Sequence, residues 1–209
     1  MRGGFESVEM LLRAARLSRH DLECLAAADA LASASGHRRN AAWTVAGIEA
    51  PPPVLTDAPL HEGAVELAAP TESEEIVADY VSLGLTLRRH PLALLRPRLK
   101  ALKVTNAEDI QRAPHGRRVR AAGIVTGRQR PGTASGVVFV TLEDETGFVN
   151  VVVSVRTVAA HLPPLLAARL MAVDGHFACE GEVVHVIAGR IRDFTALLGE
   201  LETRSRDFH

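Results

Sequence analysis

The chain has 209 residues, enough for one large domain or two small ones, and its 47% hydrophobic content is typical of a globular protein. Cys24 and Cys179 are too few and too far apart for a disulfide framework or a metal site, and their apolar neighbours predict buried free thiols. No apolar run reaches the ~18 residues of a membrane-spanning helix, and the N-terminus lacks the pattern of a secretory signal. We therefore expect a cytoplasmic protein with no membrane partner.

The net charge of −1 conceals a strong separation of charge along the chain. Residues 49–79 hold eight acidic residues and no Lys or Arg, whereas residues 88–130 hold twelve basic residues and two acidic ones. Half of all Lys and Arg thus fall in one fifth of the sequence. Such a cluster is typical of a surface that binds a polyanion, although a solvated basic face without a ligand is an alternative.

Helical patterns predict an N-terminal module over residues 1–48. Apolar residues recur at helical spacing over residues 8–15, and Ser18 followed by Asp21 predicts a capped start of a second helix. An acidic, proline-rich stretch over residues 49–72 predicts an extended linker.

A connector of two helices is predicted over residues 73–103, with a break at His90-Pro91 because the residue before proline is pushed out of the helical region. The second helix alternates leucines with Arg and Lys, so that it has an apolar and a basic face. It either covers the next domain with its charges in water or also guides DNA.

Residues 104–198 read as a small β-barrel. Turn-forming connections separate five β-rich segments, and a helical insert follows the third. This pattern fits a five-stranded OB-fold, whose open face and loops take single-stranded nucleic acid. The predicted class is therefore α+β, with a C-terminal tail at residues 199–209. The five segments are 117–127, the end of 128–147, 148–153, 170–179 and 183–191.

Five segments have a distinctive order of residues. In the barrel and tail they read VRAAGIVTGRQRPGTASGVVFVTLEDETGFVNVVV, EGEVVHVIAGRIRD and the terminal SRDFH, and upstream they read EEIVADYVSLGLTLRRHPLALLR and LECLAAADALASASGHRRNAAW. These segments closely resemble the C-terminal region of the error-prone C-family DNA polymerases of the ImuC type. These are relatives of the bacterial DNA polymerase III α subunit. The resemblance implies damage-induced (SOS) mutagenesis and translesion synthesis in DNA repair. It also implies three partners: DNA, single-stranded or as primer–template, an ImuB-like Y-family protein and a RecA-like accessory protein.

The same resemblance implies a helix-hairpin-helix element in the N-terminal module, which would bind phosphate through hairpin amides. Where a glycine-bearing hairpin is expected, this sequence has Ala26, Ala27 and Ala28, which reach φ > 0 at greater cost. This element is therefore expected either to bind phosphate or to serve only in the packing of the helices. The linker lacks a glutamine-led clamp-binding peptide, so contact with the sliding clamp is expected to be indirect.

No catalytic chemistry is predicted for this chain alone. The one dense carboxylate cluster of the barrel, Glu143, Asp144 and Glu145, precedes a turn glycine and is expected to shape the loop. The catalytic aspartates of the family lie upstream, so Mg²⁺ is expected for the full-length polymerase and no cofactor or metal for this chain. The alternative to a polymerase segment is a stand-alone OB-fold module for single-stranded nucleic acid.

The predicted DNA contacts are basic residues around the first strand and in the N-terminal module, because guanidinium groups pair with phosphate. Two phenylalanines are added, which either pack in the core or stack on bases. The predicted DNA-binding set is Arg117, Arg118, Arg120, Arg128, Arg130, Phe139, Phe148, Arg38 and Arg39. In the tail, Phe208 is expected either to fray or to anchor in a pocket, with Arg204, Arg206 and Asp207 as polar rim contacts. The pocket would belong either to a partner protein or to the barrel itself, with the tail folded back as a strap.

Overall fold

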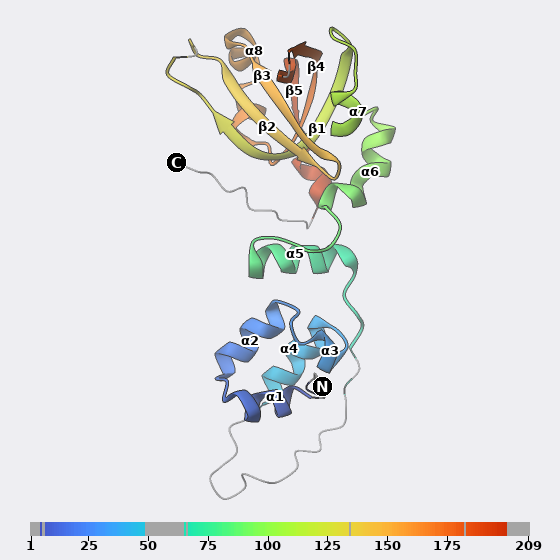
Figure 1. Cartoon of the computed structure of the whole chain (residues 1–209), viewed down its shortest axis with the longest axis vertical. Helices are drawn as coiled ribbons and strands as arrows, with labels where there is room; N and C mark the ends of the chain where they lie inside the picture. Colours follow the sequence, from blue (N-terminus) through green and yellow to red (C-terminus); the bar gives the residue numbers. More distant parts are fainter. Residues whose placement is uncertain are drawn as a thin grey trace, which may run out of the picture. The chain divides into compact units, whose positions relative to one another are not determined.

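The computed structural model describes residues 5, 7–48, 65, 67–133, 135–181 and 183–199 (Figure 1). It divides into two compact units, Met1–Leu85 and Thr86–His209. The division falls inside the segment predicted as one helical connector, so that its first helix belongs to the helical unit and its second to the barrel unit. Within the described ranges, no helix is long and apolar enough to cross a membrane.

The first unit is helical, as its apolar spacing predicts. The Ser18–Asp21 capping box starts the second helix, and Val8, Leu22 and Val45 are among the buried residues of the core. The turn after this helix places its positive φ, 59°, at Asp29 and not at the alanines before it. Aspartate tolerates this conformation better than alanine, so the turn forms without a glycine. The helices of the unit are α1 (Val8–Ala15), α2 (Arg19–Ala27), α3 (Ala32–Ser35), α4 (Arg38–Gly47) and α5 (Glu72–Leu83).

The second unit is a closed five-stranded barrel in the order β1-β2-β3-β5-β4, which confirms the predicted OB-fold. Buried residues alternate with more exposed ones along β2 and β3, whereas the first four residues of β4 are all buried, and one apolar core fills the inside of the barrel. Two short helices lie between the third and fourth strands, at the place of the predicted insert. The strands are β1 (Arg118–Gln129), β2 (Val138–Asp144), β3 (Gly147–Val153), β4 (Leu170–Glu180) and β5 (Val183–Asp193). The helices are α6 (Pro91–Ala101), α7 (Ala107–Gln111), α8 (Val155–Ala160), α9 (Leu162–Ala167) and the 3₁₀ turn η1 (Thr195–Leu198).

Strand β1 closes the barrel because it pairs with two neighbours in turn. Its first half pairs with β4 up to Ile124, which faces Leu170, and its second half pairs with β2 from Ile124 to Gln129. At the changeover, a Cβ atom on Gly123 would lie 2.8 Å from the backbone nitrogen of Glu143. Only glycine fits so close to a neighbouring backbone.

The predicted burial of the two cysteines is wrong, because both free thiols are exposed. Cys24 lies on α2 between the buried residues Leu22 and Ala26 but faces outward, and Cys179 lies near the end of β4. Apolar neighbours in the sequence did not reveal which face of each element these side chains occupy.

Candidate nucleic-acid interface

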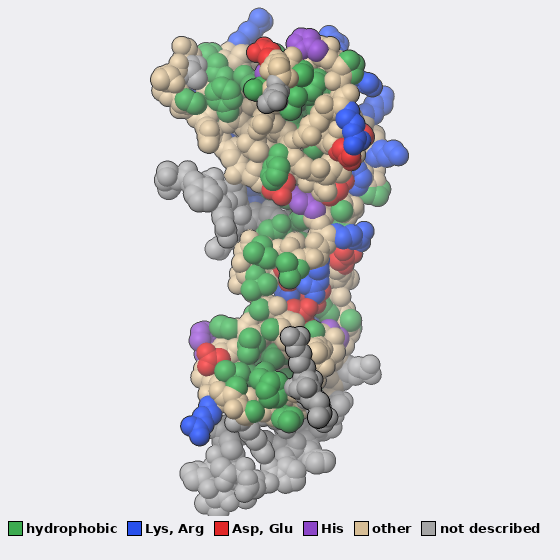
Figure 2. Space-filling model, in the orientation of Figure 1, with side chains coloured by type: hydrophobic (Ala, Val, Ile, Leu, Met, Phe, Trp, Pro, Cys, Tyr) green, Lys and Arg blue, Asp and Glu red, His purple; other side chains and the backbone are tan. Residues whose placement is uncertain are grey.

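The outer face of β2 and β3 carries exposed aromatic rings. Phe139 is 40% exposed and Phe148 is 54% exposed, because both occupy the outward positions of strands whose alternate residues are buried. Of the two open alternatives, surface and core, the structure therefore places both rings at the surface. Figure 2 shows hydrophobic side chains and few charges over the front of the barrel, with Lys and Arg along the edge near α6 and α7.

A row of outward side chains runs from this face around the closed barrel. Phe139 pairs with Val152, Val152 with Ile187, Ile187 with His176, and His176 with Arg118, so that each of the five strands contributes one residue. We call these five residues the cross-strand row. Because the barrel is closed, the row curves around it, and four steps between strands, each about 4.8 Å, give a path of about 19 Å along its surface. The row thus joins an exposed aromatic ring at one end to an exposed guanidinium at the other.

The basic end of the row opens into a hollow of about 840 Å³. Lys103, Arg117, Arg118, Arg190 and His176 line it, and Asp109 and Asp174 are its acidic members. Within the described part of the chain, the charged groups of Lys103, Arg117 and Arg190 have no hydrogen-bond or ion-pair partner. This basic hollow therefore offers cations that are not neutralised by the protein itself.

Arg120, by contrast, is held within the protein. Its guanidinium donates to the Asp174 carboxylate and, over 2.6 Å, to the carbonyl of Leu102, and Arg192 contacts the other oxygen of Asp174. Partial burial raises the pKa of Asp174, but the hydrogen bond from Arg120 and the charges of both arginines outweigh that effect and hold the pKa below its usual range. Asp174 stays ionised, and Arg120 supports the wall of the hollow.

Two further predicted contacts lie in and beside the β1–β2 loop. Arg130 is exposed. Arg128 donates from Nε to the carbonyl of Leu165 over 2.8 Å and from Nη2 to the carbonyl of Ala168, at the C-terminal end of α9. A cation there satisfies carbonyls that the helix leaves open and complements its dipole. This contact gives Arg128 a role in fixing α9 on the barrel.

Arg38 and Arg39, the adjacent arginines of the helical unit, differ in burial and in their partners. Arg38 is 8% exposed, and its guanidinium lies between the buried carboxylates of Glu75 and Asp79. Arg39 is at the surface, donates to the carbonyl of Ala68 over 2.9 Å and lies 3.4 Å from Glu74. Because the Arg38 guanidinium is buried, a phosphate cannot reach it. Arg38 was predicted to bind DNA, and the structure gives it a structural role instead.

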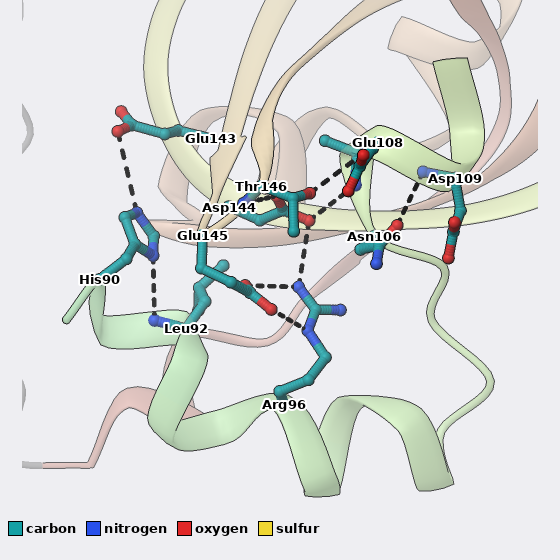
Figure 3. Close-up of polar contacts among 11 residues, drawn as sticks. His90, Leu92, Arg96, Asn106, Glu108, Asp109, Glu143, Asp144, Glu145 and Thr146 are labelled. Atoms are coloured by element: carbon teal, nitrogen blue, oxygen red, sulfur yellow. Dashed lines mark hydrogen bonds and ion pairs between the residues drawn. The ribbon is translucent and has the colours of Figure 1, made fainter. Parts of the chain in front are cut away.

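The acidic β2–β3 turn binds groups of the protein (Figure 3). Arg96 of α6 pairs with Glu145 and, over 3.0 Å, with Asp144, and Asp144 also accepts from the backbone N–H of Ala107 at the start of α7 and from Thr146. One carboxylate thus fastens two helices to the turn. Across the described residues, no cluster of His, Cys, Asp or Glu could hold a metal ion.

His90 caps α6 in its neutral form. Its Nδ1 accepts from the backbone N–H of Leu92 over 3.1 Å, and its Nε2 lies 3.8 Å from Glu143 (Figure 3). Burial lowers the pKa of His90, and the nearby carboxylates of Glu143, Glu145 and Asp144 offset only part of that effect.

We expect this depressed pKa to make the barrel unit less stable in mild acid. Because the folded state binds the proton more weakly than the unfolded state, the stabilisation is complete above the unfolded pKa of about 6.5 and is lost as the pH falls through the folded pKa. Urea unfolding at pH 7.5, 6.5 and 5.5 should show that wild type loses stability relative to His90→Asn, which keeps a capping acceptor. Parallel pH profiles for the two proteins would contradict this assignment.

The predicted partner contacts Arg204, Arg206, Asp207 and Phe208 lie outside the described residues, as does most of the predicted linker. Several interface residues were missed, namely Lys103, Val152, His176, Ile187 and Arg190. The polar residues Asp174 and His176, two positions apart on β4, indicate its outward face, but only the strand order shows that this face meets Phe139 and Arg118 in one row.

Comparison with known proteins explains the resemblance of the sequence. No protein-family model matches the chain. It is 53% identical over 205 residues to the error-prone DNA polymerase of Alkalilimnicola ehrlichii, and 52% identical over 205 residues to that of Azoarcus sp. strain BH72. Each match covers 98% of this chain. The chain is homologous to a segment of error-prone DNA polymerases. It spans about one fifth of the length of these relatives (20% and 19%).

Structures of similar shape come from other proteins. The asparaginyl-tRNA synthetase of Pyrococcus horikoshii matches with a TM-score of 0.38 and 20% identity over 44% of this chain and 23% of its own. The S. pombe Stn1–Ten1 complex matches with a TM-score of 0.33 and 16% identity over 37% of this chain and 58% of its own. The homology to error-prone polymerases therefore rests on the sequence, and the OB-fold on the barrel itself.

Proposed function

We propose that this chain is the non-catalytic C-terminal portion of an error-prone translesion DNA polymerase and that its barrel binds single-stranded DNA. The observation that supports the proposal is the cross-strand row, which leads from the exposed ring of Phe139 to Arg118 and the basic hollow. Aromatic rings stack on bases of any sequence, and unpaired cations neutralise backbone phosphates. The row curves around the closed barrel, and a strand that follows its path of about 19 Å would be at the lower end of the ~4–16 nucleotides that an OB-fold covers.

We expect binding of a fluorescein-labelled oligo(dT) to weaken with salt at a log–log slope of about −2 to −3, which corresponds to three or four neutralised phosphates. Arg117→Glu with Arg118→Glu should weaken binding at least tenfold and flatten the slope by about one, because two phosphate contacts become repulsive. Fluorescence anisotropy of the whole chain at 50–300 mM salt measures both quantities.

The matched control is Arg112→Glu with Arg156→Glu. It makes the same change in net charge at two exposed arginines that lie outside the row and the hollow. Equal weakening by the two pairs would mean that only the total charge matters, and a slope near zero in wild type would overturn the proposal.

The remaining parts of this function follow from the homology. Nucleotide transfer with Mg²⁺ is proposed for the rest of the polymerase, and the chain would take part in damage-induced mutagenesis with an ImuB-like Y-family protein and a RecA-like accessory protein. The sliding clamp would be reached through the partner. A pull-down of purified ImuB-like protein on the immobilised chain tests this; no retention above an unrelated OB-fold protein would contradict it.

The second candidate is a stand-alone module for single-stranded nucleic acid, which would use the same face. The match to error-prone polymerases over 98% of the chain includes the helical unit, and this extent favours the polymerase assignment.

A further inference from the structure

The barrel has one weakly closed seam, between β3 and β5. Only two residue pairs join these strands, Val151 with Val186 and Val152 with Ile187, whereas β4 and β5 pair over ten positions. The first residues of β3 and β5 are therefore not bonded to each other across the seam. A notch of about 150 Å³ lies there, between the two strands and α7.

The notch has an apolar floor and a polar rim. Ile110, Phe177 and Val186 line its base and are at most 3% exposed. Its rim is formed by Gln111, Phe148, Asn150 and His185. Gln111 donates from its side-chain amide to the carbonyl of Phe148 over 2.9 Å, which fixes that amide at the rim and leaves its oxygen as an acceptor. No Lys, Arg, Asp or Glu lines the notch.

Size and chemistry together select the ligand. A volume of 150 Å³ holds about five waters. It is well below the ~300–1,000 Å³ of sites for drug-sized molecules. An apolar floor, an exposed aromatic wall and amides at the edge suit a flat heteroaromatic ring with donors and acceptors on its rim. A phosphate would find no Lys or Arg there.

The notch also lies beside the proposed DNA path. Asn150 and Val152 occupy the same outward face of β3, and His185 and Ile187 the same face of β5, so the notch adjoins the middle of the cross-strand row. A single strand lying on the row would pass within one or two residues of the notch.

We propose that the notch binds one unstacked nucleobase of the single strand, with the ring against Phe148 and its polar edge toward Asn150 and Gln111. Among the four bases, adenine fits these amides best, because Asn and Gln pair with its N6 and N7. This inference rests on the proposed single-stranded DNA binding and adds a base-reading site to it.

The test follows amide signals by NMR in the whole chain, with three probes: deoxyadenosine, ribose 5-phosphate and oligo(dA). We expect the side-chain amides of Asn150 and Gln111 to shift with deoxyadenosine and with oligo(dA), but not with ribose 5-phosphate. Oligo(dA) that shifts the backbone amides of Arg117 and Arg118 but not the notch would overturn the base site and leave the proposed function standing. No shift at either place would overturn both.

A variant gives an independent readout. Asn150→Ala should weaken the binding of oligo(dA) about 2- to 10-fold relative to the binding of an abasic oligonucleotide of equal length, as expected for the loss of one hydrogen bond. The salt dependence of binding should stay unchanged, because no charge is removed. Gln129→Ala is the matched control, because it removes an exposed amide that lies opposite Phe139, beside the row but outside the notch. An unchanged ratio in Asn150→Ala, or an equal change in Gln129→Ala, would contradict the base site.

Discussion

Replacing Arg38 with alanine is expected to lower the free energy of unfolding of the helical unit by about 3–5 kcal/mol, the usual cost of removing one partner of a buried ion pair. The guanidinium lies between Glu75 and Asp79, which are 7% and 3% exposed, with Arg38 Nε 3.3 Å from Glu75. The substitution removes the cation that lies between two carboxylates from which water is largely excluded. It also removes the buried ion pairs between α4 and α5 and leaves the exposed pair of Arg39 with Glu74.

The chain provides both the control and the probe. Arg39→Ala, one residue further on, removes an exposed pair whose side chains are 43% and 50% exposed, and should cost less than about 1 kcal/mol. Trp43 is the single tryptophan and lies on α4, so that its fluorescence during urea unfolding reports on this unit alone. If Arg38→Ala abolishes the transition altogether, Arg38→Lys should retain it at a lower midpoint. Equal effects of Arg38→Ala and Arg39→Ala would show that the buried pair is not structurally important.

Replacing Gly175 with alanine is expected to destabilise the barrel by about 3 kcal/mol, at the upper end for an overpacked interior. A Cβ atom there would lie 2.3 Å from the carbonyl oxygen of Ile187 and 2.8 Å from Cγ1 of Val186. The pairing of β4 with β5 shifts register between Asp174 and Gly175, and this irregularity brings the two backbones together. A backbone carbonyl cannot move aside as a flexible side chain can.

Gly189→Ala on the facing strand is the matched control, because its added Cβ would lie 3.5 Å from the carbonyl of Asp174, an ordinary contact. Hydrogen exchange of the β4 and β5 amides measures both variants within the barrel unit. Protection factors that fall equally in the two proteins would contradict the close approach at Gly175.

The fold could be predicted from the sequence because its signals are local. The capping pattern at Ser18 and Asp21 and the turn at Gly147 each act over a few residues, and both appear at the predicted places. The barrel followed from five β-rich segments separated by turn-forming connections. These patterns depend only on neighbours in the chain.

The site could be predicted only in part, because charge in a sequence does not show what the charge faces. Arg38 and Arg39 are adjacent and chemically identical, yet one is buried by acids about forty positions away and the other is at the surface. Arg128 was expected at DNA but binds the carbonyls of Leu165 and Ala168. Both differences arise from long-range contacts that the local pattern does not contain.

The double pairing of β1 also orders the steps by which the barrel folds. The β2–β3 hairpin joins Asp144 to Gly147, only three positions apart, whereas closure pairs Arg118 with His176, 58 positions apart. Loop-closure entropy makes the local hairpin form early and the β1–β4 pairing late. Until β4 has been synthesised and docked, β1 keeps an open edge of unpaired backbone groups, and chains cut short in that interval are exposed to edge-to-edge aggregation.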